Sequence, residues 1–207
     1  MFGKKLLMAM VSAGTLIWIA GIASGMGILW RYAGTPGAKR ASLDFWPAST
    51  TIQRDPHRFT LLMFAHPRCS CTRASLEELT SIMTKTDGRL AVRILFFKPD
   101  EFSDEWTASD LWSKAAELPG VRISLDAGGA EASRFGAATS GQVFVYEPGG
   151  KLVFSGGVTG ARGHTGENDG RLSVIEHVTG GLSQMSQTPV YGCPLFSESF
   201  ECEICLK

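Results

Sequence analysis

Two cysteines separated by a single residue are the first feature of this sequence that could carry chemistry. Cys69 and Cys71 lie in HPRCSCTRASLEEL, residues 66–79, directly before residues with helical hydrophobic spacing. A cysteine at a helix N-terminus meets backbone N–H groups and the positive end of the helix dipole, which favour thiolate over thiol. The pair could be a redox couple, a metal clamp or two structural thiols in a turn. We favour a redox couple in which Cys69 attacks and Cys71 resolves.

Three neighbours of this pair are candidate supporting residues. His66 could tune the pKa of Cys69 or carry a proton, or it could simply end the preceding strand. Arg68 could stabilise a thiolate as a nearby cation, or face solvent. Thr72 could donate to the sulfur or cap the helix, and capping is the commoner role for threonine.

Three further cysteines lie near the C-terminus, in YGCPLFSESFECEICLK. The total of five cysteines is odd, so at least one thiol is free, metal-bound or paired with another chain. Cys202 and Cys205 form a CxxC motif, and Cys193 precedes them. These residues could form a tail disulfide, a relay that exchanges electrons with Cys69 and Cys71, or a weak metal clip.

The N-terminal segment is predicted to be a membrane anchor, residues 1–32. Residues 6–30 contain no charged side chain and would span roughly 37 Å as a helix. That length crosses a bilayer and exceeds the apolar core of a signal peptide, so we expect an uncleaved anchor. Basic residues on both sides leave the orientation open. The short basic N-terminus resembles a signal anchor, which places the domain on the extracytoplasmic side.

The remaining residues are expected to form one α/β domain. Residues 33–58 are predicted to be a linker whose DFWP segment is a candidate for docking, 59–182 the domain, and 183–207 a cysteine-containing tail. Strands that alternate with helices imply parallel pairing with helices on both faces. The expected strands are 59–66, 89–98 and 121–126 with a hairpin over 142–157. The expected helices follow the cysteines and cover 104–118, 129–136 and 167–180, the last with Leu172, Ile175 and Val178 facing the core.

Composition argues against nucleic-acid and nucleotide binding. Twenty basic residues balance twenty acidic residues, and no basic run or nucleic-acid motif occurs. The glycine-rich GVTGARGHTGENDG lacks the lysine and the preceding strand of a P-loop.

The order of elements, with cysteines between the first strand and its helix, resembles the thioredoxin superfamily over about residues 59–180. FGAATSGQVFVYEPGGKLVFSGG looks like the stretch that carries the loop facing the active site. The superfamily usually has a cis-proline there, which shapes the groove for the substrate and keeps metal ions off the cysteines. Gly141 matches the position of that proline. The resemblance therefore leaves open whether this chain binds a peptide in such a groove and whether it excludes metals. Thr72 occupies the usual second cysteine position of CxxC. A disulfide across one residue would be strained and more oxidising than that of thioredoxin, about −270 mV.

FAHPRCSCTRASLEEL, with ATSGQVFVY, SGGVTGARGHTGENDGR and YGCPLF, resembles more narrowly the RedB-like group of membrane-anchored thioredoxin-fold proteins. The resemblance implies a thiol-disulfide oxidoreductase with a central mixed sheet flanked by helices and a redox-active centre. We expect it to exchange or isomerise disulfides of a protein substrate without an organic cofactor, and a membrane redox partner is a further candidate.

Three other functions remain open at this point. A copper(I) metallochaperone would use Cys69, Cys71 and His66 or His164, because copper(I) prefers soft ligands. A thiol peroxidase would oxidise Cys69 to sulfenic acid, although PRCSCT lacks the peroxiredoxin arrangement. A structural scaffold would need neither cysteine.

Overall fold

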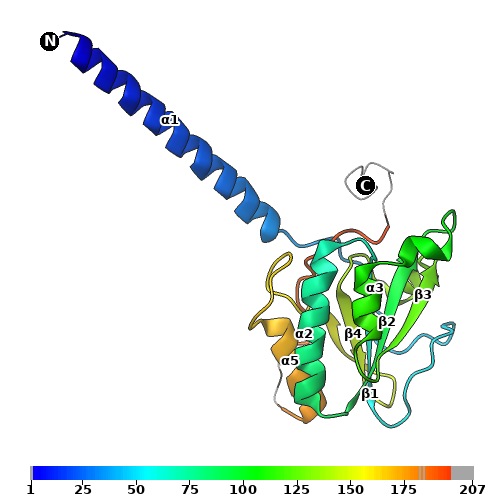
Figure 1. Ribbon diagram of the computed structural model, residues 1–207. Coiled ribbons are helices and arrows are strands. Elements are labelled where there is room, and N and C mark those ends of the chain that lie inside the picture. Colours follow the sequence, from blue (N-terminus) through cyan, green and yellow to red (C-terminus); the bar gives the residue numbers. More distant parts are fainter. Residues whose placement is uncertain (1, 182, 184, 197–207) are drawn as a thin grey trace. The chain divides into compact units, whose positions relative to one another are not determined.

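The computed structural model describes residues 2–181, 183 and 185–196, and the chain divides into two compact units, 1–35 and 36–207. The first unit contains α1, Phe2–Ala33, the blue helix of Figure 1. Within Gly3–Ala33 an 18-residue window has a mean hydropathy of 2.0, and none of that window is buried. By length and composition this helix could cross a membrane.

The second unit is built on a five-stranded mixed sheet in the order β3-β2-β1-β4-β5. β1 pairs in parallel with β2, and β2 with β3, whereas β4 is antiparallel to both β1 and β5. The parallel pairing predicted for the first three strands is therefore confirmed. The strands are β1 Phe59–Ala65, β2 Leu90–Lys98, β3 Arg122–Ala127, β4 Gln142–Tyr146 and β5 Leu152–Gly156.

The central strand β1 explains why its sequence is a continuous apolar run. Leu61 and Met63 face one hydrophobic cluster, and Leu62 and Phe64 face a second cluster on the other side of the sheet. All four side chains are at most 1% exposed. A strand buried on both faces has no position at which a polar residue would be favoured.

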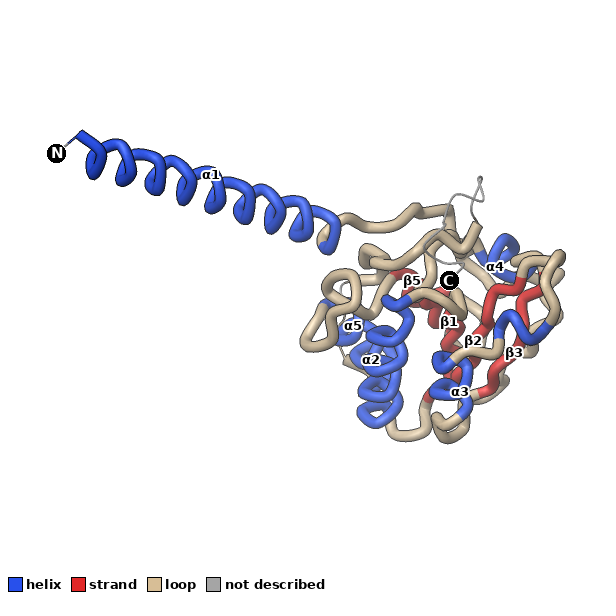
Figure 2. Tube along the Cα trace, turned by 45° about the horizontal axis from the view of Figure 1, so that its top comes forward, coloured by secondary structure: helices blue, strands red, loops and turns tan. Residues whose placement is uncertain are grey.

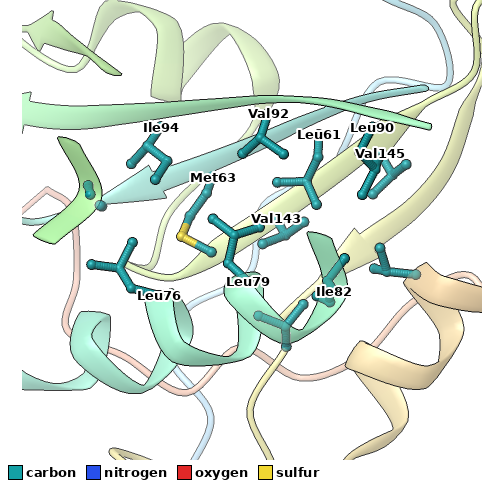
Figure 3. Packing of buried hydrophobic residues seen from close by; sticks show 14 of the residues in the cluster. Leu61, Met63, Leu76, Leu79, Ile82, Leu90, Val92, Ile94, Val143 and Val145 are labelled. Atoms are coloured by element: carbon teal, nitrogen blue, oxygen red, sulfur yellow. The ribbon is translucent and has the colours of Figure 1, made fainter. Parts of the chain in front are cut away.

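Helices cover the two faces of the sheet unequally (Figures 1 and 2). On the first face lie α2 Ser70–Thr86, α3 Asp110–Ala116 and α5 Asp169–Thr179, whereas the short α4 Ala130–Phe135 contributes to the second cluster. Figure 3 shows Leu76, Leu79 and Ile82 of α2 directed at the sheet, as their helical spacing predicts.

The predicted linker packs onto the second face of the sheet through Trp46 and Ile52. The backbone N–H of Trp46 donates to the Gly150 carbonyl at 2.7 Å. Its ring contacts Phe135 and Tyr146 edge to face, with centroids 5.2 and 5.1 Å away. The predicted docking of the DFWP segment is confirmed.

Two details of the predicted helices are wrong. The single helix expected over 104–118 is divided into a 3-10 turn, η1 Asp104–Thr107, and α3. Ser109 has extended backbone and its hydroxyl accepts the N–H of Trp112, so it caps a new helix instead of continuing the turn. In α5, Leu172 was expected to face inward but is 42% exposed. Val178 is buried as expected, and Ile175 packs against the same cluster. Arg171 is also buried, because it pairs with a buried carboxylate.

Candidate redox site

Cys69 is the N-cap residue of α2, where the chain leaves β1. Its φ and ψ are −91° and 115°, its N–H donates to the His66 carbonyl at 3.1 Å, and its carbonyl accepts the N–H of Thr72 at 3.0 Å. The capping role predicted for Thr72 is therefore wrong, because Cys69 holds that position and no side chain caps the helix. Cys69 is 1% and Cys71 6% exposed, so both sulfurs are enclosed by protein.

The structure brings a third sulfur to this pair. Cys193 Sγ lies 2.9 Å from Cys69 Sγ, although 124 positions separate the residues in sequence. Cys69, Cys71 and Cys193 are all free thiols. Cys202 and Cys205, the other predicted tail cysteines, lie outside the described residues.

Interactions among the three sulfurs shift their pKa values in different directions. Thiol donation from Cys193, and then from Cys71, holds the pKa of Cys69 well below its ordinary value, and backbone N–H groups of both residues add to the effect while burial opposes it. The pKa of Cys193 is raised because its thiol donates to Cys69 and then to Cys71. For Cys71, a hydrogen bond with Cys193 lowers the pKa, but the hydrogen bond with Cys69 and burial raise it by more. The pKa of Cys71 is therefore above its ordinary value. Of the three cysteines, Cys69 is the one whose pKa is lowered.

Removing the Cys193 donor should raise the pKa of Cys69. We expect the thiolate absorbance assigned to Cys69, as the difference from Cys69→Ser, to titrate below the ordinary thiol pKa of about 8.5. Cys193→Ala should shift that midpoint upward because the largest stabilising hydrogen bond is lost. Cys193→Ser is the matched control, since a hydroxyl can still donate. Identical midpoints in the alanine variant and the unmodified chain would contradict the assignment.

Ser140 joins the elements of the site, although no sequence motif marks it as a functional residue. Its side chain is fully buried, and its Oγ accepts the N–H of His66 at 2.8 Å and lies 2.8 Å from Thr72 Oγ1. Its own N–H donates to the Cys193 carbonyl at 2.8 Å. The only sequence signal was its position beside Gly141, in the loop matched to the thioredoxin active-site loop.

Gly141 is required by the backbone of the loop that carries Ser140. Its φ is +87°, its N–H donates to the Phe64 carbonyl at 2.8 Å, and an added Cβ would lie 2.7 Å from Ser75 Oγ. Proline cannot adopt this conformation, because its ring holds φ near −65°. The position matched to the superfamily proline therefore has a backbone that only glycine adopts readily.

Gly141→Ala should destabilise the protein by roughly 1–3 kcal/mol, because alanine is strained at positive φ and its methyl group meets Ser75. The free energy of unfolding, measured with denaturant on the full chain, tests this expectation. Gly149→Ala is the control, since Gly149 has no positive φ and its Cβ would make ordinary contacts. Equal losses in both variants would contradict the argument.

His66 and Arg68 lie beside an aromatic group at the edge of the site. The His66 ring stacks on Phe97 and meets Trp106 edge to face, with centroids 6.1 and 5.4 Å away. Its Nδ1 accepts the N–H of Arg68 at 3.2 Å, so the neutral ring carries its proton on Nε2. Burial, partly offset by Cys69, lowers the pKa of His66. The guanidinium carbon of Arg68 lies 5.2 Å from the Trp106 centroid. A proton-carrying role for His66 stays a prediction.

The metal-binding alternative depends on how the donor residues are grouped. His164 is exposed, and its Nδ1 lies 2.8 Å from the Arg162 carbonyl. Among the described residues, no three His, Cys, Asp or Glu side chains are grouped so that they could hold a metal ion. The copper alternative stays a prediction.

Comparison with solved structures extends the description of the fold. A hypothetical protein from Sinorhizobium meliloti is 22% identical, with 80% of this chain and 96% of that chain covered and a TM-score of 0.57. An uncharacterized conserved protein from Geobacillus kaustophilus is 15% identical, with 80% and 94% covered and a TM-score of 0.55. The exposed lipoprotein thioredoxin of Streptococcus pneumoniae is more distant, with 16% identity, 60% and 86% covered and a TM-score of 0.44.

No protein-family model and no curated protein matches the sequence. The second unit nevertheless has a thioredoxin-like fold: a mixed sheet flanked by helices, with the cysteines at the junction of β1 and α2. This agrees with the fold class predicted from the sequence.

Proposed function

We propose that this protein is a thiol-disulfide oxidoreductase in which Cys69 is the nucleophile. One observation carries the proposal: Cys69 is at the N-terminus of α2 with its Sγ 2.9 Å from Cys193 Sγ, and hydrogen bonds with Cys193 and Cys71 lower its pKa. A thiolate attacks disulfides, whereas a thiol does not. The thioredoxin-like fold is compatible with this chemistry but does not by itself establish it.

The proposed reaction begins when the Cys69 thiolate attacks one sulfur of a substrate disulfide. A mixed disulfide between Cys69 and the substrate forms, and the other substrate sulfur leaves as a thiolate that takes up a proton. A second cysteine of the protein then attacks Cys69 and releases the substrate. From the sequence, this second role is predicted for Cys71.

The proposed setting is a membrane surface with protein substrates. The apolar α1 supports single-pass anchoring, and disulfide exchange suits an extracytoplasmic domain, because disulfides persist in oxidising compartments. The RedB-like resemblance is consistent with this setting. The reaction between sulfur atoms needs no organic cofactor.

A redox titration of the full chain in detergent tests the function. Samples equilibrated in graded glutathione buffers are quenched with acid, unfolded, alkylated and analysed by mass spectrometry, so that burial does not hide Cys69. We expect a two-electron transition that includes Cys69 and disappears in Cys69→Ser. If Cys69 stays alkylatable in every buffer, the proposed function is wrong, and copper binding or peroxide reduction should be measured instead.

A further inference from the structure

The segment that carries Cys193 is held across the redox site by backbone contacts. Pro194 forms an antiparallel bridge with Thr139, and the Leu195 N–H donates to the Ala138 carbonyl at 2.9 Å. Leu195 is 2% exposed and belongs to the second hydrophobic cluster. These contacts fix the position of Cys193 beside Cys69.

Gly192 allows this close approach. A Cβ at Gly192 would lie 2.0 Å from the Ser140 carbonyl oxygen, so no other residue fits there without moving the loop. The Arg162 guanidinium donates to the Gly192 carbonyl at 2.5 Å. Ser140 bonds this segment through its N–H and the Cys69 side of the site through its hydroxyl, so the two sulfurs share one rigid support.

We infer that Cys193 is the disulfide partner of Cys69, and that the redox couple of this protein joins α2 to the C-terminal segment instead of closing within the CxC motif. The inference rests on the proposed function. The two sulfurs would need to approach by only roughly 0.9 Å to reach the bond length of a disulfide. Closing the pair leaves Cys71 free and avoids the small ring of a Cys69–Cys71 bond.

The substrate disulfide is the oxidant that converts the two cysteines into a disulfide. Cys69 attacks that disulfide and forms a mixed disulfide, and the first substrate thiolate leaves. Cys193 then loses its proton and attacks Cys69 Sγ, so the Cys69–Cys193 bond forms and the second substrate thiolate leaves. Two protein thiols are oxidised to one disulfide, and one substrate disulfide is reduced to two thiols.

The charge distribution suits this order of steps. In the reduced protein the thiolate of Cys69 keeps Cys193 protonated, since that thiolate is the largest cause of the raised pKa of Cys193. Formation of the mixed disulfide removes the negative charge from Cys69. Cys193 can then ionise more easily, when its nucleophilicity is needed.

A matched pair of variants separates the two candidate partners. Cys71→Ser and Cys193→Ser are made in the full chain, both with Cys202→Ser and Cys205→Ser, and reacted with glutathione disulfide. Intact mass distinguishes a glutathione adduct from an internal disulfide. We expect Cys71→Ser to release glutathione and close its disulfide at least about tenfold faster than Cys193→Ser, in which the adduct on Cys69 accumulates.

The outcomes distinguish the inference from the proposed function. Faster closure in Cys193→Ser, equal closure in both variants, or persistent adducts in both would overturn the inference while leaving Cys69 as an exchanging thiol. No adduct on Cys69 in either variant would overturn the proposed function itself. In the chain without other substitutions, proteolysis after Arg68, Arg73 and Glu198 should yield two peptides joined by a disulfide. One peptide contains Cys69 and Cys71 and the other contains Cys193, whereas Cys202 and Cys205 are released separately.

Discussion

Cys69→Ser should lower the rate of disulfide exchange by at least about a hundredfold, because a serine hydroxyl remains protonated where the cysteine is a thiolate. The measurement is the reduction of a model peptide disulfide by the reduced full chain, followed by the product thiol. Ser70→Ala, at the exposed neighbouring position, is the control and should keep the rate. A Cys69→Ser variant that retains the full rate would move the nucleophile to another cysteine.

The loss in Cys69→Ser should reflect chemistry and not misfolding. Serine has nearly the same shape as cysteine and keeps the backbone bonds to His66 and Thr72 that position the start of α2. We therefore expect the free energy of unfolding of the reduced variant to stay within about 1 kcal/mol of the unmodified value. A larger loss of stability would mean that the thiolate also holds the fold together.

Glu78→Ala should destabilise the domain by about 3–5 kcal/mol, because it leaves a buried charge without its partner. Glu78 of α2 is 2% exposed, and its Oε2 accepts a hydrogen bond from the guanidinium of Arg171 in α5 at 2.9 Å. Its Oε1 accepts the N–H of Gly166 at 2.5 Å. One carboxylate thus joins α2, α5 and the glycine-rich loop, and denaturant unfolding measures its contribution.

Two further variants test the physical reason for this loss. Glu77→Ala changes the neighbouring but exposed carboxylate and should shift the free energy of unfolding by no more than about 0.5 kcal/mol. Glu78→Leu combined with Arg171→Leu removes both charges, and should recover much of the stability lost in Glu78→Ala. If the double variant is as unstable as the single one, the shape of the pair matters more than the buried charge.

The position of Cys69 at the start of α2 could be predicted from the sequence because its determinants are local. A buried strand ends at Ala65, Cys69 follows, and helical spacing of Leu76, Leu79 and Ile82 starts soon afterwards. That order places Cys69 at a helix N-terminus whatever the rest of the fold does. The roles of Arg68 and Thr72 were harder to infer, since each side chain contacts residues that are distant in sequence.

The sequence by itself determined the apolar N-terminal helix, the order of strands and helices, and the position of Cys69 at the start of α2. These features depend on hydrophobic periodicity and on neighbours a few positions away. Only the tertiary structure decided that Ser140 binds both sides of the site and that Cys193, 124 positions from Cys69, lies 2.9 Å from it. Such contacts depend on how β4, its preceding loop and the C-terminal segment pack together, and no local pattern specifies a distance between residues so far apart in the chain.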